Sequence, residues 1–302
     1  MGGQDEWQEP LNSVEALGLD CEIPPLPEKR QSFGTFLTPF NPVQLAVCGG
    51  TSLANAQHLG GFDRADCVTL NVKTSQWEQD KFQNRLPIDW PIQGVIKMEG
   101  QGVFVVHQYS ISVLQQGSKR WVSGPSFQTE AVCSCIISST KFVTIHWSDE
   151  NNVLGYSVGE SFEPVEEPTD TWPSLLTKRR GPGCGATARH LVVAGGMSAS
   201  DEILSSVEIF TIDSYLHCFG RGADMQLPRA FFQLIPIGSQ HTRLLAVGGK
   251  TVSAPITLST SEWWDEEVNS WESGPTLATG RSHFGALLVP ASLVCPPKLA
   301  GE

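Results

Sequence analysis

The chain has 302 residues, of which 40% are hydrophobic and 17% charged, with 29 glycines and 20 prolines. This composition can bury a large core, which excludes disordered and collagen-like proteins. The formal net charge of −12 disfavours nucleic acid and anionic membranes, so we expect a protein or a small molecule as partner. No apolar run reaches the ~18 residues that span a bilayer, and the first ten residues do not resemble a signal peptide. We therefore expect a cytoplasmic or nuclear protein; the alternative is a mature secreted fragment whose signal peptide has been removed.

The eight cysteines are even in number, which permits a disulfide framework. We expect reduced thiols packed as small hydrophobic side chains instead, because the chain is long and has neither a signal peptide nor an N-glycosylation sequon. The cysteines are Cys21, Cys48, Cys67, Cys133, Cys135, Cys184, Cys218 and Cys295.

In chain order, the first predicted strands are short, at residues 14–17 and 21–23. Three longer apolar runs then each end in a glycine pair: LAVCGG at Gly50, LVVAGG at Gly196 and LLAVGG at Gly249. Short apolar runs that end in paired glycines indicate buried strands that enter a turn with positive φ.

Each glycine pair precedes a polar loop and then a strand of alternating polarity, such as residues 67–72 or 207–212. A further short strand follows, and it carries an aromatic residue or a cysteine. The matching positions are Cys21, Trp77, Trp121, Phe162, Cys218 and Trp271, with a mean spacing of 50 residues. A fixed period of this length is typical of repeat architectures.

This pattern resembles the Kelch-repeat β-propeller, on the evidence of the three glycine pairs, Trp77, Trp121 and Trp271. The resemblance implies an all-β, six-bladed propeller of Kelch type with four antiparallel strands per blade. Two units depart from the family pattern, because His107-Gln108 and His146-Trp147 stand where a glycine pair is expected.

Both ends of the chain are expected to close the ring, because a propeller must cover its terminal strand edges. Residues 1–25 would supply two outer strands and residues 282–302 two inner strands of one blade. The chain would then be a single propeller over residues 1–302.

The Kelch resemblance implies that partners meet the face made by the loops between second and third strands and between successive blades. Five arginines fall in these loops at nearly equivalent positions, and on a propeller they would form a ring able to grip acidic peptide side chains. The alternative is that each arginine pairs with a local carboxylate and joins neighbouring blades. The predicted partner-binding residues are Arg30, Arg85, Trp90, Trp172, Arg180, Arg229, Arg281 and His283.

Two of these residues are tryptophans outside the structural aromatic position of the repeat, Trp90 and Trp172. A tryptophan beside arginine is typical of interface hot spots, and packing beneath a long loop is the alternative.

Metal binding and catalysis have little support in the sequence. If residues 139–140 form a two-residue turn, Cys133 faces His146 with Cys135 on the same face, but a structural zinc needs a fourth ligand and none is evident. No nucleophile, metalloprotease or phosphate-loop motif is present, so we predict no cofactor and no catalytic residues.

The leading functional hypothesis is a protein-interaction module that binds a partner peptide or loop, including an acidic segment, as an adaptor or scaffold. The family resemblance implies ubiquitin-ligase substrate recognition or cytoskeletal roles. The alternative is a propeller enzyme or small-ligand protein with its site at the pore mouth, near His58 and His283.

Overall fold

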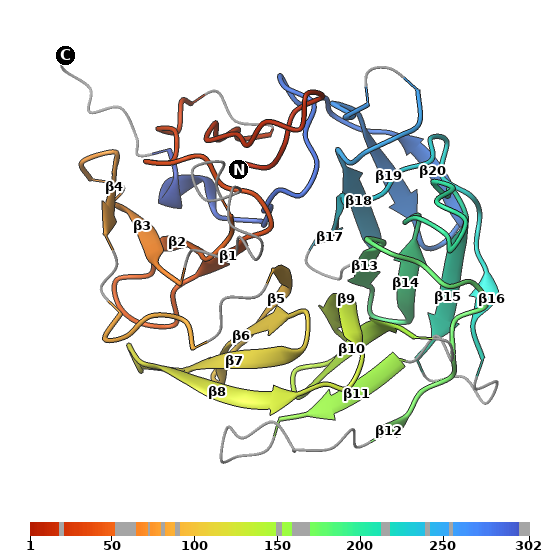
Figure 1. Cartoon of the computed structure of the whole chain (residues 1–302), viewed down its shortest axis with the longest axis horizontal. Coiled ribbons are helices and arrows are strands. Elements are labelled where there is room, and N and C mark those ends of the chain that lie inside the picture. The colour runs from red at the N-terminus through yellow and green to blue at the C-terminus, as the bar shows by residue number, and fades with distance from the viewer. Residues whose placement is uncertain are drawn as a thin grey trace.

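The computed structural model describes most of the chain. The described residues are 1–17, 21–51, 65–71, 73–79, 82–87, 91–148, 153–158, 170–212, 218–238, 242–253 and 256–295. Their strands form five four-stranded antiparallel sheets arranged as blades around a central axis (Figure 1). The chain is therefore an all-β propeller.

Each blade follows sequence order from its innermost to its outermost strand, so each is built from consecutive hairpins. Blades 1 and 2 consist of β1 (Gly34–Leu37), β2 (Leu45–Cys48), β3 (Cys67–Asn71), β4 (Gln76–Gln79), β5 (Ile92–Met98), β6 (Gly102–His107), β7 (Ser110–Gln115) and β8 (Trp121–Ser126). Blade 3 consists of β9 (Glu130–Ile136), β10 (Lys141–Trp147), β11 (Val153–Ser157) and β12 (Asp170–Thr171). Blades 4 and 5 consist of β13 (Gly183–Ala186), β14 (His190–Ala194), β15 (Val207–Thr211), β16 (Gly220–Arg221), β17 (Gln233–Ile237), β18 (Arg243–Val247), β19 (Ser261–Asp265) and β20 (Ser270–Ser273).

The second strand of each blade is its most buried strand. In β2, β6 and β14 almost every side chain is buried, since each strand lies between two neighbours in its own sheet and between two adjacent blades. This burial explains why these segments are continuous apolar runs rather than alternating ones. The first strands β1, β5, β9, β13 and β17 contact one another in that order around the axis.

The three glycine pairs lie in turns whose positive backbone φ angles favour glycine. Gly49 and Gly50 have φ of 72° and 92°, and a Cβ on Gly50 would lie 2.7 Å from the carbonyl oxygen of Gln31. The other two pairs repeat these positive φ values. The expected strand-to-turn geometry is thus present in three blades.

The predicted number of blades is wrong, because the described residues contain five four-stranded sheets rather than six. The described segments near the two ends of the chain, residues 1–17 and 281–295, lie between β17 and β1 (Figure 1), where Gln4 bridges Ser282 and a disulfide joins Cys21 to Cys295. Within the described part of residues 282–302 the two expected inner strands are not formed, and this segment contains the 3-10 helix η2 (Ala291–Leu293).

The cysteines also correct a prediction, because six of the eight form disulfides. Cys48–Cys67 joins β2 to β3 within blade 1, and Cys133–Cys184 joins β9 to β13 across two blades. Among the described residues, Cys135 and Cys218 are free. Since disulfides persist mainly in oxidising compartments, the argument for a cytoplasmic or nuclear location loses its basis.

The register of blade 3 differs from the predicted two-residue turn. Cys133 lies opposite Ile145, and an irregularity in the strand places His146 opposite Ala131. Cys133 is held in its disulfide, and the part of the chain that the structure describes holds no cluster of three metal-ligating side chains. No helix among these residues is long and apolar enough to cross a membrane.

Candidate functional site

Four buried arginines at equivalent positions of the repeat make the same set of contacts. Each donates a hydrogen bond from Nη1 to the carbonyl of the first glycine in a pair and forms an ion pair with a carboxylate through Nη2. The four sets are Arg30 with Gly49 and Asp66, Arg179 with Gly195 and Glu208, Arg229 with Gly248 and Glu262, and Arg281 with Gly2 and Glu15.

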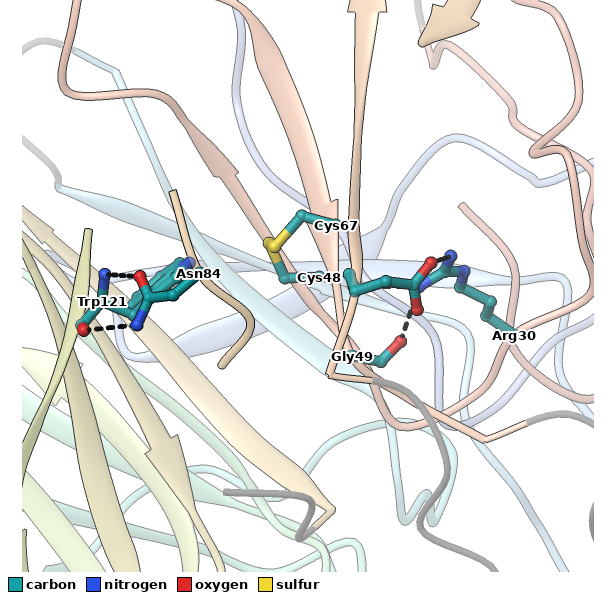
Figure 2. The surroundings of a disulfide bond; sticks show 7 residues. Arg30, Cys48, Gly49, Cys67, Asn84 and Trp121 are labelled. Carbon is teal, nitrogen blue, oxygen red and sulfur yellow. Dashed lines mark hydrogen bonds and ion pairs between the residues drawn. A yellow bond between two sulfur atoms is a disulfide. The ribbon is translucent and has the colours of Figure 1, made fainter. Parts of the chain in front are cut away.

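Arg229 illustrates the geometry of this arginine anchor. Its guanidinium lies 2.8 Å from the carbonyl oxygen of Gly248 and 2.5 Å from Oε1 of Glu262. Burial lowers the pKa of Arg229, and the charge of Glu262 opposes that shift. The anchor of blade 1 has the same arrangement, with Arg30 beside Gly49 and close to the Cys48–Cys67 disulfide (Figure 2).

The predicted ring of exposed arginines is not present at Arg30, Arg229 and Arg281, whose side chains are almost fully buried in these local pairs. They therefore follow the alternative of local carboxylate pairing. In blade 4 the anchor is Arg179 rather than the predicted Arg180. The sequence could not distinguish the two because they are adjacent and identical.

Arg180 is exposed and belongs instead to a cluster of two cations on the ring of Trp147, in which Lys178 and Trp147 are half-buried. The guanidinium carbon of Arg180 lies 4.7 Å from the centre of the Trp147 ring, and Nζ of Lys178 lies 4.6 Å from it. Trp147 ends β10, and the two cations lie in the loop between blades 3 and 4. We call Trp147, Lys178 and Arg180 the cationic patch.

The loop that carries the cationic patch is held in place by Glu208 on β15. Glu208 accepts hydrogen bonds from the backbone N–H of Leu176 at 2.6 Å and of Thr177 at 3.0 Å, in addition to its ion pair with Arg179. A backbone bridge between Arg180 and Met197 fixes the other end. The two cations are thus presented by a constrained loop, which lowers the entropy cost of binding.

Trp147 was not among the predicted binding residues, because His146-Trp147 stands where the repeat is expected to have a glycine pair. The signal in the sequence was a large aromatic residue at the end of a buried strand, directly before a polar loop. The tryptophan and the cations come from segments about 30 residues apart. Only the tertiary fold brings them together.

The remaining predicted residues occupy different environments. Arg85 is exposed in the loop between blades 1 and 2, whereas Trp90 lies outside the described residues. Trp172 packs against Phe210 with ring centres 5.0 Å apart, within the core shared by blades 3 and 4. It therefore follows the packing alternative rather than forming an exposed hot spot.

His283 lies at the mouth of the central channel, stacked on Phe231 with ring centres 4.1 Å apart. Burial, followed by the charge of Lys250, lowers the pKa of His283 to about 4, so the ring is neutral at pH 7. The cavity that it lines has a volume of about 130 Å³. Small-molecule sites typically enclose roughly 300–1,000 Å³, so this channel mouth is small for a substrate.

A second polar pocket, of about 350 Å³, lies between blades 4 and 5 and is lined by His190, Cys218, Arg221 and Glu266. Glu266 is buried, and its Oε1 accepts from Nε of Arg189 at 2.7 Å and lies 2.9 Å from Nδ1 of His190. Its Oε2 is buried and has no hydrogen-bond partner among the described residues. A buried carboxylate oxygen in this state favours a donor ligand.

Comparison with known proteins supports the fold alone. No protein-family model matches the chain, and no curated protein matches it. Among solved structures, that of YjhT is similar with a TM-score of 0.63 and 11% sequence identity, covering 85% of this chain and 89% of that chain. At this identity the similarity shows a shared β-propeller fold.

Proposed function

We propose that this chain is a protein-binding propeller, of Kelch type in its glycine pairs and arginine anchors, which holds an acidic segment of a partner protein at the cationic patch. The observation that carries the proposal is the placement of Lys178 and Arg180 on the ring of Trp147 by a loop pinned to Glu208. An adaptor or scaffold role would follow from such binding.

The chemistry of the patch supports an acidic partner. Arginine and tryptophan are enriched in interface hot spots, where the arginine provides a bidentate donor for carboxylates and the indole provides apolar contact area. Among the described residues, no carboxylate pairs with the Arg180 guanidinium. A local positive site on a molecule of net charge −12 also gives orientation to an acidic ligand.

Affinity capture with the full chain tests this function. We expect wild-type protein to retain a partner from lysate of its own source that Arg180→Glu and Trp147→Ala fail to retain. Arg120→Glu is the matched control, because Arg120 is an exposed arginine on the turn before β8. Equal capture by all four proteins, with equal melting temperatures, would contradict the proposal.

A second candidate is a small-ligand protein. The volume at the channel mouth does not favour the site near His283, whereas the unpartnered Oε2 of Glu266 favours the pocket between blades 4 and 5. A thermal-shift screen of cationic and hydroxylated metabolites tests this alternative. A ligand that raises the melting temperature of the wild type, but not that of a folded Glu266→Gln variant, would support this alternative.

A further inference from the structure

The pocket between blades 4 and 5 has the size of a small-molecule site. It encloses about 350 Å³, within the range of roughly 300–1,000 Å³ that is typical of such sites. Ile209 and Thr211 on β15 line it from blade 4, and Trp264 on β19 lines it from blade 5. The pocket shares no residue with the cationic patch, so an inference from it does not depend on partner binding at that patch.

Glu266, which also lines the pocket, joins the two blades and has one oxygen to spare. Its side chain is fully buried. Its Oε1 accepts from Nε of Arg189 at 2.7 Å and lies 2.9 Å from Nδ1 of His190, and both of these residues belong to blade 4. Its Oε2 is buried and has no hydrogen-bond partner among the described residues. Since a buried acceptor without a donor is costly, Oε2 favours a ligand that carries an N–H or O–H group.

Asn269 holds the pocket wall in place from the turn before β20. Its Oδ1 accepts from Nε1 of Trp264 and from the backbone N–H of Ala223, at 3.2 Å in each case. The indole of Trp264 also lies perpendicular to the ring of His190, with ring centres 6.2 Å apart. A ligand would therefore meet side chains that are already positioned, which lowers the entropy cost of binding.

The wall of the pocket in blade 4 supplies hydroxyl, thiol and imidazole groups. His190 and Thr211 lie opposite each other on β14 and β15, and Cys218 precedes β16. Arg221 also borders the pocket, but it lies opposite Glu208 in the sheet. Because successive residues of a strand point to opposite faces, Glu208 and Arg221 belong to the face of blade 4 away from Thr211.

We propose that this pocket binds a small organic cation whose primary ammonium group donates to Oε2 of Glu266. The inference rests on the second candidate function, ligand binding in this pocket, and names the class of ligand. The Arg189 guanidinium that pairs with Oε1 is 62% exposed, so water screens it and the buried carboxylate keeps much of its negative charge. A charged donor is therefore favoured over a neutral one, because charge-assisted hydrogen bonds are roughly twice as strong.

Other features of the pocket support an ammonium group. The indole ring of Trp264 attracts cations through its quadrupole. The hydroxyl oxygen of Thr211 can accept a further N–H from the same group. The net charge of −12 also raises the concentration of cations near the surface of the molecule.

Cys218 allows the proposal to be tested on the full chain by thiol–disulfide exchange. It is exposed and lines the pocket, whereas Cys135, the other free cysteine among the described residues, is buried. The probe is cystamine, a small disulfide with an ammonium group at each end. The Cys218 thiolate attacks one sulfur of cystamine, the S–S bond of cystamine breaks, and a new disulfide joins an aminoethyl group to Cys218. The cysteamine thiolate that leaves takes the proton given up by Cys218. Hydroxyethyl disulfide is the matched probe, with a hydroxyl in place of each ammonium group.

Peptide mapping by mass spectrometry gives the initial labelling rate of Cys218 with each probe. The ratio of the cystamine rate to the hydroxyethyl disulfide rate cancels any change in the reactivity of the thiol itself. We expect this ratio to be about tenfold higher in wild type than in Glu266→Gln, which keeps an oxygen for Arg189 and His190 but loses the charge. Glu272→Gln is the matched control, because it changes the net charge equally at an exposed position outside the pocket.

A ratio that falls only in Glu266→Gln supports the proposal. Equal ratios in wild type and folded Glu266→Gln, or an equal fall in both variants, overturn it. A neutral hydroxylated ligand that raises the melting temperature of wild type but not of Glu266→Gln, with equal labelling ratios, overturns the organic cation and leaves the second candidate function intact.

Competition by propylamine tests the proposal on the wild type alone, without a substitution at a buried residue. Excess propylammonium should slow the labelling of Cys218 by both probes severalfold, because the amine occupies the pocket that Cys218 lines. Propanol with potassium chloride at the same ionic strength is the control. Equal labelling rates with propylamine and with this control overturn the proposal.

Discussion

Single residues with buried charge explain how the loop that precedes a blade is fixed to that blade. Arg229 and Glu262 form an ion pair in which both side chains are almost fully buried, and Glu262 also accepts from the backbone N–H of Gln226 and Leu227. Each member of this network satisfies another, so removing one member leaves buried groups without partners. The same arrangement recurs at Arg179 and Arg281.

We expect Arg229→Leu to lower the free energy of unfolding by about 3–5 kcal/mol, because Glu262 and the carbonyl of Gly248 lose their partner. The double variant Arg229→Leu/Glu262→Leu should lose less, since no uncompensated charge remains. Urea unfolding measures both. Exposed Arg120→Leu serves as control, within about 0.5 kcal/mol of wild type. A loss no larger than that of the control would show that the anchor is not structural.

Acid sensitivity is expected from His146. Its ring nitrogens lie 2.8 Å from Oγ1 of Thr144 and 3.1 Å from the carbonyl oxygen of Thr129. Burial lowers the pKa of His146 from 6.5 to about 4, so the unfolded chain binds a proton more readily than the folded chain. The stability contributed by neutral His146 is therefore complete above about pH 6.5 and is lost as the pH falls towards 4, by up to about 3 kcal/mol.

The measurement is the free energy of unfolding between pH 4 and 7.5, for wild type and for His146→Gln. The variant should show a flatter dependence on pH over this range, because it has lost one group that titrates. Identical slopes for the two proteins would contradict the assignment. His283 should add to this loss of stability at acidic pH, because its pKa in the folded chain is also lowered to about 4.

At the scale of elements, neighbouring blades are joined by apolar packing. Blades 3 and 4 are also joined by a disulfide between their first strands. Cys133 on β9 and Cys184 on β13 enclose 51 residues of sequence, whereas Cys48 and Cys67 enclose 19 within blade 1. Both pairs lie in hydrophobic clusters. The difference in loop length allows the contribution of blade-to-blade linkage to be separated from that of local packing.

We expect Cys133→Ala/Cys184→Ala to destabilise the chain more than Cys48→Ala/Cys67→Ala, by about 0.9 kcal/mol on the chain-entropy argument for the two loop lengths. Each double variant should lose roughly 2–4 kcal/mol in total. Denaturant unfolding of the oxidised proteins gives these values. A larger loss for the blade 1 pair would show that burial of the thiols, rather than loop closure, controls stability.

At the scale of the whole molecule, the ring is completed by segments from opposite ends of the sequence. Arg281 contacts Gly2, Ser13 and Glu15, and the Cys21–Cys295 disulfide joins the same regions. Gly3 donates to the carbonyl of Arg30, which extends these contacts to blade 1. The closure thus connects blade 5 to blade 1 through the chain ends.

Deletion of residues 1–25 or 282–302 is expected to lower the melting temperature of the entire ring, because each removes one side of this closure and exposes apolar faces of blades 1 and 5. Differential scanning calorimetry with near-UV circular dichroism tests the effect on all blades. Deletion of residues 296–302 alone is the control, since it retains Cys295. A truncated chain that melts at the wild-type temperature would show that closure at the termini does not stabilise the ring.

Local sequence patterns predicted much of this protein, because each pattern reflects a short-range requirement. Apolar runs such as residues 45–48 and 191–194 are buried strands, and the glycine pairs after them have positive φ. Strand content and four-stranded units follow directly from such patterns. The irregular units were also visible, since β6 ends at His107 and β10 at His146-Trp147, where the other units have a glycine pair.

Tertiary structure decided the features that depend on segments far apart in the sequence. The choice between Arg179 and Arg180 as anchor depends on the position of Glu208 on another strand, and the cationic patch depends on Trp147 meeting the loop after blade 3. Disulfide pairing and the number of complete blades likewise depend on which strands become neighbours. Sequence alone thus determined the all-β repeat, because hydrophobic periodicity and turn chemistry are local, whereas exposure, charge pairing and strand completion were set by contacts that only the closed ring creates.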